Sequence, residues 1–562
     1  MKFFSSFFLM ALLACGISGS ALAQAVPSSA EPSRVGGQIA PMAVAPSISG
    51  GAAVSSPGAV SAPDGADKIR LKLQQLIIED MTAYTPAEVE PLYGSMIGKT
   101  VTLADVFGIA AALTAKYRND GYILTQVILP PQTIDGGVVR MRVVEGYADR
   151  VMIEGATRGN RAYIQGYADR IKAAKPLNAA VLERYMLLMN DLPGLSARAV
   201  LSPAKTPGAS DIAIVVEQRP YSLFFQTDNR GSRYIGPLQL TAGAQLNNTF
   251  GLYEGLSFQA AVAPDGWPDP EMTFGSLTWQ QPVGHEGTRI DLNGSISATH
   301  PGFTLVPFDV NGIAHSAFLR LQHPFLRTRN ISVTGNAKID YLNSSRDDNL
   351  GLPATKDRVR SLRIGGTLQA ADRWSGLNAL GAEVSKGLDI LGASRKGDAN
   401  ISRALGDPQF MKVTADASRL QRLGGPFSLF VSATGQKSAN TLLASEEFGV
   451  GGMTFGSAYD NSEITGEDGI AARAELRADN LFSTPASLLQ LYGFYDIGQV
   501  WDRDNAVVKD RIRSLASAGA GLRATITPNV SGNFEVAAPL TRPVQTTGNN
   551  NPRFFGALTL RY

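Results

Sequence analysis

The chain has 562 residues, too many for one compact soluble core, so its length predicts two or three domains. Its formal net charge of +2, with 18% charged residues, disfavours a nucleic-acid-binding domain, which would carry clustered lysine and arginine. The 58 glycines are scattered rather than periodic, which suits tight turns and close-packed strands.

The first 23 residues have the pattern of a secretory signal: Lys2, an apolar stretch, and an A-x-A cleavage site at residues 21–23. Cleavage there would remove Cys15, the only cysteine of the sequence, so the mature chain could form no disulfide. In an alternative interpretation, residues 12–15 form a lipoprotein signal and Cys15 carries lipid. No later stretch reaches the ~18 apolar residues of a transmembrane helix. The mature chain is therefore expected to be either soluble or a membrane β-barrel.

Residues 24–67 are rich in Ala, Ser, Pro and Gly and contain few large apolar side chains. Such a composition cannot offset the entropy lost on ordering, so it predicts a flexible linker. The segment shows no convincing helical period.

Two successive units of mixed α/β texture follow, over residues 68–145 and 146–219. The first begins with a predicted strand over 68–80 and continues with a helix that starts at Thr102, an N-cap with Asp105 three residues on. Each unit has the order β-α-α-β-β, so the pair is an internal repeat. Each unit is expected to form a small sheet with helices on one face and an exposed strand edge.

From residue 220 to 562, helix signals largely disappear and apolar residues alternate with polar ones. In the segment 471–479, for example, Arg473, Glu475 and Arg477 alternate with alanine and leucine. A soluble antiparallel sheet with one wet face is the simpler interpretation. About 16 candidate strands are more than two packed soluble sheets usually contain, and charges at every second position suit a polar lumen. An open edge in lipid would leave backbone groups unpaired, so the sheet is expected to close into a barrel.

The chain ends on a strand with an apolar face. Alternation places four of its large side chains on that face: Phe554, Leu558, Leu560 and Tyr562.

Several long segments, in the same order, resemble the two-partner secretion transporters of the haemolysin secretion/activation family. They are residues 121–146, residues 183–220, the stretch that opens "QTDNRGSRYIGPLQL", and "YGFYDIGQVWD" with its Asp-x-Gly. The resemblance covers residues 68–562. It implies a signal peptide, two periplasmic polypeptide-transport-associated (POTRA) domains of α+β type, and a 16-stranded outer-membrane barrel.

The resemblance also implies the function and the partners. Such a transporter exports a large haemolysin- or adhesin-like polypeptide, which the POTRA domains capture and the barrel lumen passes. Outer-membrane lipid and the barrel-assembly machinery would be further partners, and nucleic acid would not. Two alternatives are an assembly factor of the same superfamily, which usually has more POTRA domains, and a passive porin, which needs none.

A loop at about 447–469 falls where the family has a loop folded into the lumen. The family tip usually carries Arg-Gly-Tyr, and its arginine is expected to pair with the aspartate of the Asp-x-Gly segment, here Asp496. The tip of this chain has serine and alanine in place of the arginine and glycine; its residues are Gly456, Ser457, Ala458 and Tyr459. A serine cannot make the bidentate, charge-assisted contact of an arginine. We therefore expect either Arg473 or Arg477 to pair with Asp496, or Asp496 to be solvated in a wet lumen.

The sequence contains no pattern that predicts catalysis or a cofactor. The four histidines show no metal-ligand spacing, and the mature chain has no cysteine for zinc or thiol chemistry. The partial G-x-G-x-x-A motif at residues 519–524 lies in a strand pattern, where it indicates a glycine-containing barrel strand.

Overall fold

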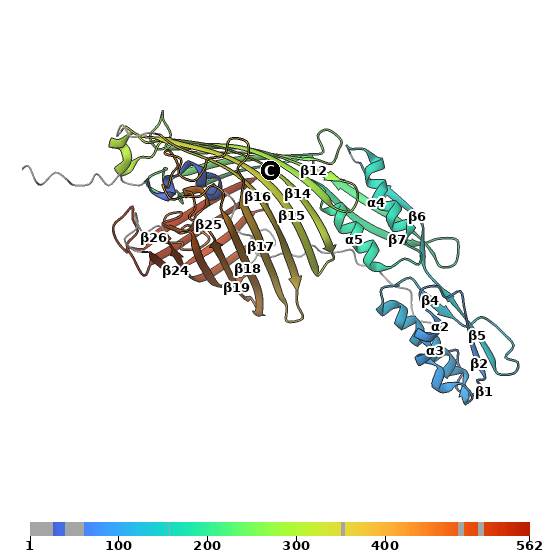
Figure 1. Ribbon diagram of the computed structural model, residues 1–562. Coiled ribbons are helices and arrows are strands. Elements are labelled where there is room, and N and C mark those ends of the chain that lie inside the picture. The colour runs from blue at the N-terminus through green and yellow to red at the C-terminus, as the bar shows by residue number, and fades with distance from the viewer. Residues whose placement is uncertain (1–25, 40–60, 157, 350–353, 481–487, 504–510) are drawn as a thin grey trace, which may run out of the picture.

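The computed structural model describes residues 26–39, 61–156, 158–349, 354–480, 488–503 and 511–562. The predicted signal sequence and Cys15 lie outside the described residues. Figure 1 shows a large barrel with two small α+β units attached in series at one end. We call the barrel end beside these units the near end and the opposite end the far end.

The first α+β unit differs from the predicted order β-α-α-β-β in two ways: its first strand is divided, and a short strand, β3, lies between its two helices. Leu73 N–H donates to Lys99 O and Gln74 N–H to Gly137 O, so the stretch predicted as one strand over 68–80 is two strands in separate sheets. Helix α3 begins after Thr102, whose side chain forms a reciprocal capping box with Asp105. The elements of this unit are β1 (Arg70–Lys72), β2 (Gln75–Glu79), α2 (Pro86–Val89), β3 (Thr100–Thr102), α3 (Leu103–Asn119), β4 (Gln126–Ile128) and β5 (Val138–Val144).

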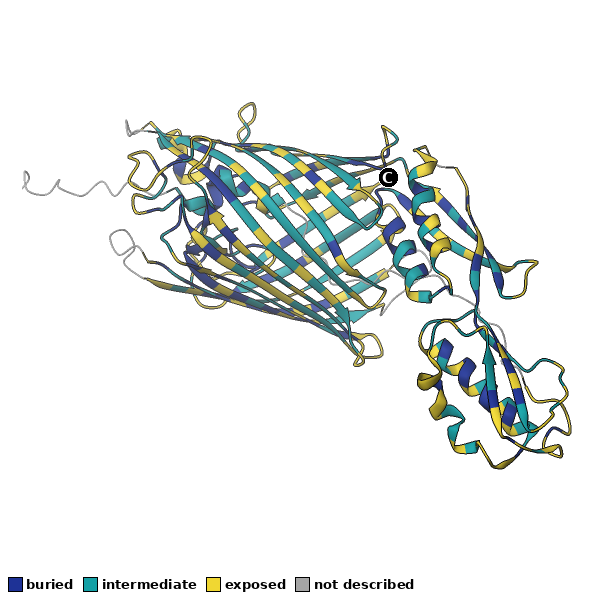
Figure 2. Cartoon of the chain, turned by 45° about the vertical axis from the view of Figure 1, so that its right-hand side comes forward, coloured by how far each residue is buried: buried dark blue, intermediate teal, exposed yellow. Residues whose placement is uncertain are grey.

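The second α+β unit packs two helices on a three-stranded sheet of order β6-β8-β7. Its β6 pairs parallel with β8, and β7 pairs antiparallel with β8, so β6 and β7 are the edge strands. Figure 2 shows buried residues gathered between the helices and the sheet. The elements are β6 (Tyr147–Glu154), α4 (Arg161–Ala173), α5 (Ala179–Asn190), β7 (Leu195–Pro203) and β8 (Ala209–Gln218).

The remaining strands form a closed antiparallel barrel of 16 strands among the described residues, as alternation predicted. The first barrel strand, β9, pairs with the last, β26, so no strand edge is left open. The strands are β9 (Tyr221–Asp228), β10 (Gln239–Asn247), β11 (Gly255–Ala263), β12 (Met272–Val283), β13 (Thr288–Thr299), β14 (Asn311–Arg327), β15 (Ile331–Asp347), β16 (Thr355–Ala371), β17 (Gly376–Gly387), β18 (Met411–Gly424), β19 (Phe427–Ser438), β22 (Asp468–Asp479), β23 (Leu488–Trp501), β24 (Ile512–Thr527), β25 (Val530–Pro539) and β26 (Arg553–Arg561).

The barrel is apolar outside and polar inside. Leu476 is 51% exposed on the outer face of β22, whereas its neighbour Glu475 is 1% exposed on the lumen face. Figure 2 shows exposed residues recurring along the strands of the wall, and many of them are large and apolar. An apolar outer face is stable only against lipid. The large apolar side chains predicted for one face of the last strand all point outward and are exposed: Phe554, Leu558, Leu560 and Tyr562.

Residues 28–39, predicted as part of a flexible linker, instead form short helical turns inside the far end of the barrel (Figure 1). Their apolar side chains are small, but Ala30 and Val35 are buried against Tyr234 and Ile235 of the loop between β9 and β10. The sequence gives no sign of this order because the stabilising surface comes from distant parts of the chain. The elements are η1 (Ser28–Ala30), η2 (Pro32–Arg34) and α1 (Val35–Ile39).

Candidate functional site

A long loop between β19 and β22, residues 439–467, enters the barrel and packs against the inner wall. Its two arms pair as a short hairpin of β20 (Phe448–Val450) and β21 (Ile464–Gly466). Val450, Ala458 and Tyr459 of this loop are buried against lumen-facing side chains of β23, β24 and β26. The loop therefore occupies part of the lumen.

Glycine permits the sharp turns of this loop. Gly451, Gly452 and Gly456 have φ angles of 125°, 93° and 90°, which residues with a Cβ rarely adopt. The turn at Gly456 points two successive backbone N–H groups toward the barrel wall. The glycines thus give the loop tip a concave set of hydrogen-bond donors.

Those donors meet Asp496, which lies on the lumen face of β23 and is fully buried. Its Oδ2 accepts hydrogen bonds from the N–H groups of Gly456 at 3.2 Å and Ser457 at 2.9 Å. The hydroxyl of Ser517 on β24 lies 3.2 Å from the same oxygen. Asp496 is therefore bound by protein groups and is not the solvated carboxylate that was one expectation.

Arg473 supplies the positive charge at this contact. It lies directly opposite Asp496 in the register of β22 and β23, and its Nη1 is 3.2 Å from Asp496 Oδ1. The same Nη1 donates to Ser457 Oγ at 2.7 Å. One wall guanidinium thus contacts both the wall carboxylate and the loop tip, where the Ser457 hydroxyl accepts its hydrogen bond.

Arg477 does not reach Asp496. Its Nε donates to Glu475 Oε1 at 2.6 Å, and its guanidinium lies over the ring of Phe430. Glu475 also pairs with Arg473 at 2.9 Å and with Arg523 at 2.6 Å. The wall residues named from the sequence therefore form one charge network, in which Arg473 contacts the loop tip and Arg477 does not.

The tip is held on its other side by groups that the sequence did not single out. Arg230 donates to Ser457 O at 3.2 Å and pairs with Glu535 at 2.7 Å, while Arg553 pairs with Asp460 at 2.8 Å. Nothing in the local pattern around Arg230, Glu535 or Arg553 indicates which loop residue each contacts.

Tyr459, the one tip residue that keeps the family's identity, is 2% exposed. Its hydroxyl contacts Ala516 O at 3.3 Å and Arg542 O at 3.1 Å. The tyrosine therefore ties the tip to β24 and to the loop that follows β25.

The base of the loop is tied to the segment at residues 28–39. Arg34 donates to Ala444 O and to Glu447 O, the latter at 3.1 Å, and its guanidinium lies 3.8 Å from the Glu447 carboxylate. Arg403, from the loop between β17 and β18, pairs with Glu447 at 3.0 Å and also contacts Glu467. Three separate parts of the chain thus meet at the far end of the lumen.

The second α+β unit docks on the near end through the turn between β12 and β13. Glu286 of that turn accepts from Arg170 Nε at 3.0 Å, from Arg184 at 3.2 Å and from the Tyr185 hydroxyl at 2.9 Å. His285 beside it lies 4.9 Å from the Tyr163 ring, centroid to centroid, in a stacked arrangement. Both helices of the unit therefore hold one barrel turn.

Burial alone would raise the pKa of Glu286, but the hydrogen bonds from Tyr185, Arg184 and Arg170 outweigh it and hold the pKa below its usual range.

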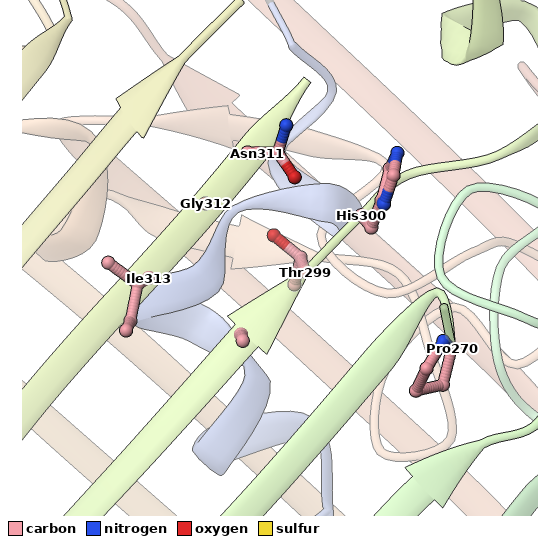
Figure 3. A pocket seen from close by; sticks show the side chains of 7 residues that line it. Pro270, Thr299, His300, Asn311, Gly312 and Ile313 are labelled. Carbon is pink, nitrogen blue, oxygen red and sulfur yellow. The ribbon is translucent and has the colours of Figure 1, made fainter. Parts of the chain in front are cut away.

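Two cavities are relevant to the lumen. One of about 1270 Å³ lies below the inward loop and is lined by polar side chains such as Gln226, Arg230 and Arg523. A smaller one of about 260 Å³ lies at the far-end rim between β13 and β14 (Figure 3), beside His300 and Asn311. The small cavity lies next to the segment at residues 28–39 and brings together no group of metal ligands.

Across the described ranges, no cluster of three His, Cys, Asp or Glu side chains could hold a metal ion. No helix in the described part of the chain is both long and apolar enough to cross a membrane.

A closed barrel with an apolar outer wall, a loop anchored in its lumen and α+β units docked at one end defines a class: outer-membrane barrels with POTRA domains. Residues 208–524 match the family described as haemolysin secretion/activation protein ShlB/FhaC/HecB, and residues 71–146 match the POTRA domain, ShlB-type. The chain belongs to this family of two-partner secretion transporters, and is an outer-membrane protein whose two α+β units are POTRA domains.

Known proteins agree with this assignment along most of the chain. It is 21% identical over 486 residues to the heme/hemopexin transporter protein HuxB of Haemophilus influenzae (strain 86-028NP), which covers 84% of each chain. It is 24% identical over 499 residues to the outer membrane transporter CdiB of Escherichia coli O6:K15:H31 (strain 536 / UPEC), covering 84% of this chain and 79% of that one. The solved structure of CdiB from Escherichia coli has the same fold, with a TM-score of 0.74 at 20% identity, over 99% of this chain and 97% of that one.

Proposed function

We propose that this transporter exports one large secreted polypeptide and that its inward loop is the gate. The observation that carries the gate is the contact of the loop tip with Asp496 and Arg473, which holds the loop across the lumen. The tip makes only a few hydrogen bonds to this ion pair of the wall, so the contact can break and reform without unfolding the barrel. Catalysis and cofactors play no part in this proposal.

Cargo capture falls to the POTRA domains. In the second domain, β6 and β7 each pair with β8 on one side, which leaves their other edges to accept an extended chain. Addition of a strand to such an edge uses main-chain hydrogen bonds and needs no defined cargo sequence. The near-end cavity of about 1270 Å³ then receives the chain below the gate. During biogenesis, we expect the barrel-assembly machinery to insert the barrel into outer-membrane lipid.

Locking the loop tip to the wall tests the gate. Ser457 and Ser517 both reach the Asp496 carboxylate, so cysteines at these two positions can be joined by a short bifunctional thiol reagent. The mature chain predicted from the sequence contains no other cysteine. We expect the cross-linked protein to lose cargo export and to regain it when a cleavable cross-link is cut.

The matched control joins Gly449→Cys to Ser462→Cys, because a Cβ at Gly449 would lie 3.0 Å from Ser462 Cβ. This cross-link closes the hairpin on itself and leaves the tip free, so export should continue. Export through a protein with its tip locked would refute the gate. Deletion of the gene without loss of any large secreted polypeptide would refute the export function itself.

A further inference from the structure

Three basic side chains lie on the outer wall at the far end of β16 and β17. Lys356 and Arg358 share the outward face of β16 with Leu362 and Ile364, since they lie an even number of residues apart. Arg360 lies between them on that face, but it is only 2% exposed and donates to Leu342 O and Leu391 O, so it is not available to a ligand. On β17, Lys386 pairs with Leu362 and lies two residues beyond the exposed Val384. We call Lys356, Arg358 and Lys386 the rim patch. These three residues lie on the same outward face as the lipid-facing side chains of β16 and β17, but closer to the cell exterior.

The rim patch begins where the apolar outer surface ends. Outward from Ile364 along β16, the residues of the outer face become basic, and Tyr341 of β15 lies beside them, paired with Arg360. Tyrosine is enriched at the membrane–water interface of such barrels. The rim patch therefore lies at the level of lipid head groups rather than in the acyl layer or in bulk solvent.

A cavity of about 330 Å³ adjoins two members of the rim patch. Lys356 and Arg358 form one side of it, and residues 392–394 and 398–400 of the β17–β18 loop form the other. Backbone hydrogen bonds hold the loop in place: Ser394 N–H donates to Arg358 O at 2.9 Å, and Lys356 N–H donates to Asn400 O at 2.5 Å. The cavity is thus built by hydrogen-bonded backbone and has two cations in its lining.

The charge of the rim patch is not neutralised within the described ranges. Neither Lys356 nor Arg358 forms an ion pair there, and Lys386 donates to the backbone oxygen of Gln409 at 2.7 Å. Asp398 also lines the cavity; its carboxylate accepts the backbone N–H of Arg395 at 2.9 Å and pairs with neither Lys356 nor Arg358 in the described ranges, so two cations and one carboxylate line the cavity.

A nearby basic group differs from the rim patch in this respect. Lys437 and Arg503 both pair with Asp468, at 2.6 Å and 3.3 Å, so that group carries its own counter-charge. The rim patch therefore offers cations that need an external anion.

We propose that the rim patch binds the phosphate of a phosphorylated lipid in the outer leaflet, with the acyl chains lying along Leu362, Ile364 and Val384. Lysine and arginine near a membrane surface each contribute about 1 kcal/mol toward an anionic head group. An arginine adds the planar donor geometry that matches phosphate oxygens. A free phosphate would gain the charge contacts but not the apolar wall below them, so a lipid is favoured over a soluble anion.

The site has a structural connection to the lumen. The β17–β18 loop that forms the cavity wall also carries Arg403, which contacts Glu447 and Glu467 at the base of the inward loop. A bound lipid would therefore fix the outer part of a loop whose inner part holds the gate base.

Native mass spectrometry of the full-length protein in detergent, with bisphosphorylated lipid A as the probe, tests the proposal. The variant K356Q/R358Q/K386Q removes the rim patch, and K72Q/K99Q/K205Q removes three exposed POTRA lysines as a control of equal charge change. At about 1 kcal/mol for each cation, the first variant should bind about a hundredfold more weakly, and the control should bind as the unmodified protein does. Equal binding by the two triple variants would overturn the proposal.

Two further probes separate the sources of binding. Lipid A without phosphates should bind weakly; retention as strong as that of the phosphorylated lipid would show that the acyl chains alone are recognised and would refute the phosphate site. Inorganic phosphate should not compete at concentrations equal to those of the lipid; effective competition would show a free-anion site instead.

If the triple variant fails to fold, the single variants Arg358→Lys and Arg358→Gln test whether the positive charge of the rim patch binds the lipid. Arg358→Lys keeps the charge and should keep most of the binding, whereas Arg358→Gln should reduce it about fivefold. Equal binding by these two variants would refute the proposal.

Discussion

Replacement of Arg473 by glutamine should release the loop tip from the barrel wall. The side chain is 5% exposed, and its strongest contacts are with Asp496 at 3.2 Å, with Glu475 at 2.9 Å and with Ser457 Oγ at 2.7 Å. Longer contacts join it to Met453 O of the loop at 3.4 Å and to Glu535 at 3.7 Å. The Ser457 contact crosses from wall to tip, and a hydrogen bond to a charged group contributes about 1.5–3 kcal/mol. Asp496 would keep the N–H groups of Gly456 and Ser457, so the loss should stay near the lower end of this range. We expect the closed state of the tip to lose about 2 kcal/mol relative to the open state, which is a change of about thirtyfold in the open fraction.

The rate at which a single cysteine at Ala458 reacts with a maleimide measures that change. Ala458 is fully buried in the closed loop, so labelling requires the tip to move. In Arg473→Gln the labelling rate should rise about thirtyfold if opening is rapid compared with labelling. The matched control is Arg477→Gln, on the same strand face, which removes a contact with Glu475 but none with the tip.

Two results would contradict this reasoning. The first is a labelling rate in Arg473→Gln equal to that of the unmodified protein, and the second is an equal rise in Arg477→Gln. Either result would mean that the packing of Tyr459 and its neighbours, and not the Arg473 contact, holds the tip.

Three other predictions concern the loop tip, the turn that contacts the second POTRA domain, and the segment at residues 28–39. Ser457→Arg restores the family residue at the tip and should open the loop, because it places a second cation beside Arg473. The double variant S457R/R473Q should close the loop again. The labelling rate of a cysteine at Ala458 measures both effects. Glu286→Gln should loosen the second POTRA domain from the barrel, seen as faster hydrogen exchange in α4 and α5, while Asp169→Asn on the solvent side of α4 should not. Because the pKa of Glu286 is lowered on docking, its contribution is fully present above the ordinary glutamate pKa of about 4.3 and is lost as the pH falls through the lowered value; docking that strengthens in acid would contradict this. Arg34→Gln should free residues 28–39 from the inward loop, so that a protease added outside the cell cleaves them faster; unchanged cleavage would show that the apolar contacts of Val35 suffice.

Local patterns in the sequence were enough to predict the individual elements. The capping pair Thr102 and Asp105 marked the start of α3, and strict alternation marked both faces of β22. Such signals depend on contacts within a few residues or on which side of a strand meets lipid. Closure into a barrel followed from the requirement that lipid-exposed edges pair.

Contacts between distant segments could not be predicted in this way. Arg34 binds Glu447 O across 413 residues, and Arg170 binds Glu286 across 116. Nothing in the composition of either segment identifies the partner, so the order of residues 28–39 and the docking of the second POTRA domain were missed. Arg473 became a candidate for Asp496 because strand alternation put both in the lumen, but only the register of β22 and β23 distinguished it from Arg477.

One hairpin touches both functional ends of the molecule. The turn between β12 and β13 is gripped by the second POTRA domain through Glu286, and at the far end Ser297 of β13 donates a hydrogen bond of 2.7 Å to Pro32 O in the lumen segment. The 12 residues of β13 span about 40 Å, and a hydrogen-bonded strand extends little under load. The hairpin is therefore a stiff element that contacts the second POTRA domain at its periplasmic end and the segment at residues 28–39 at its cell-surface end. Any force on the second POTRA domain, such as the pull of a cargo bound as proposed above, would therefore act on the same hairpin that holds residues 28–39 in place.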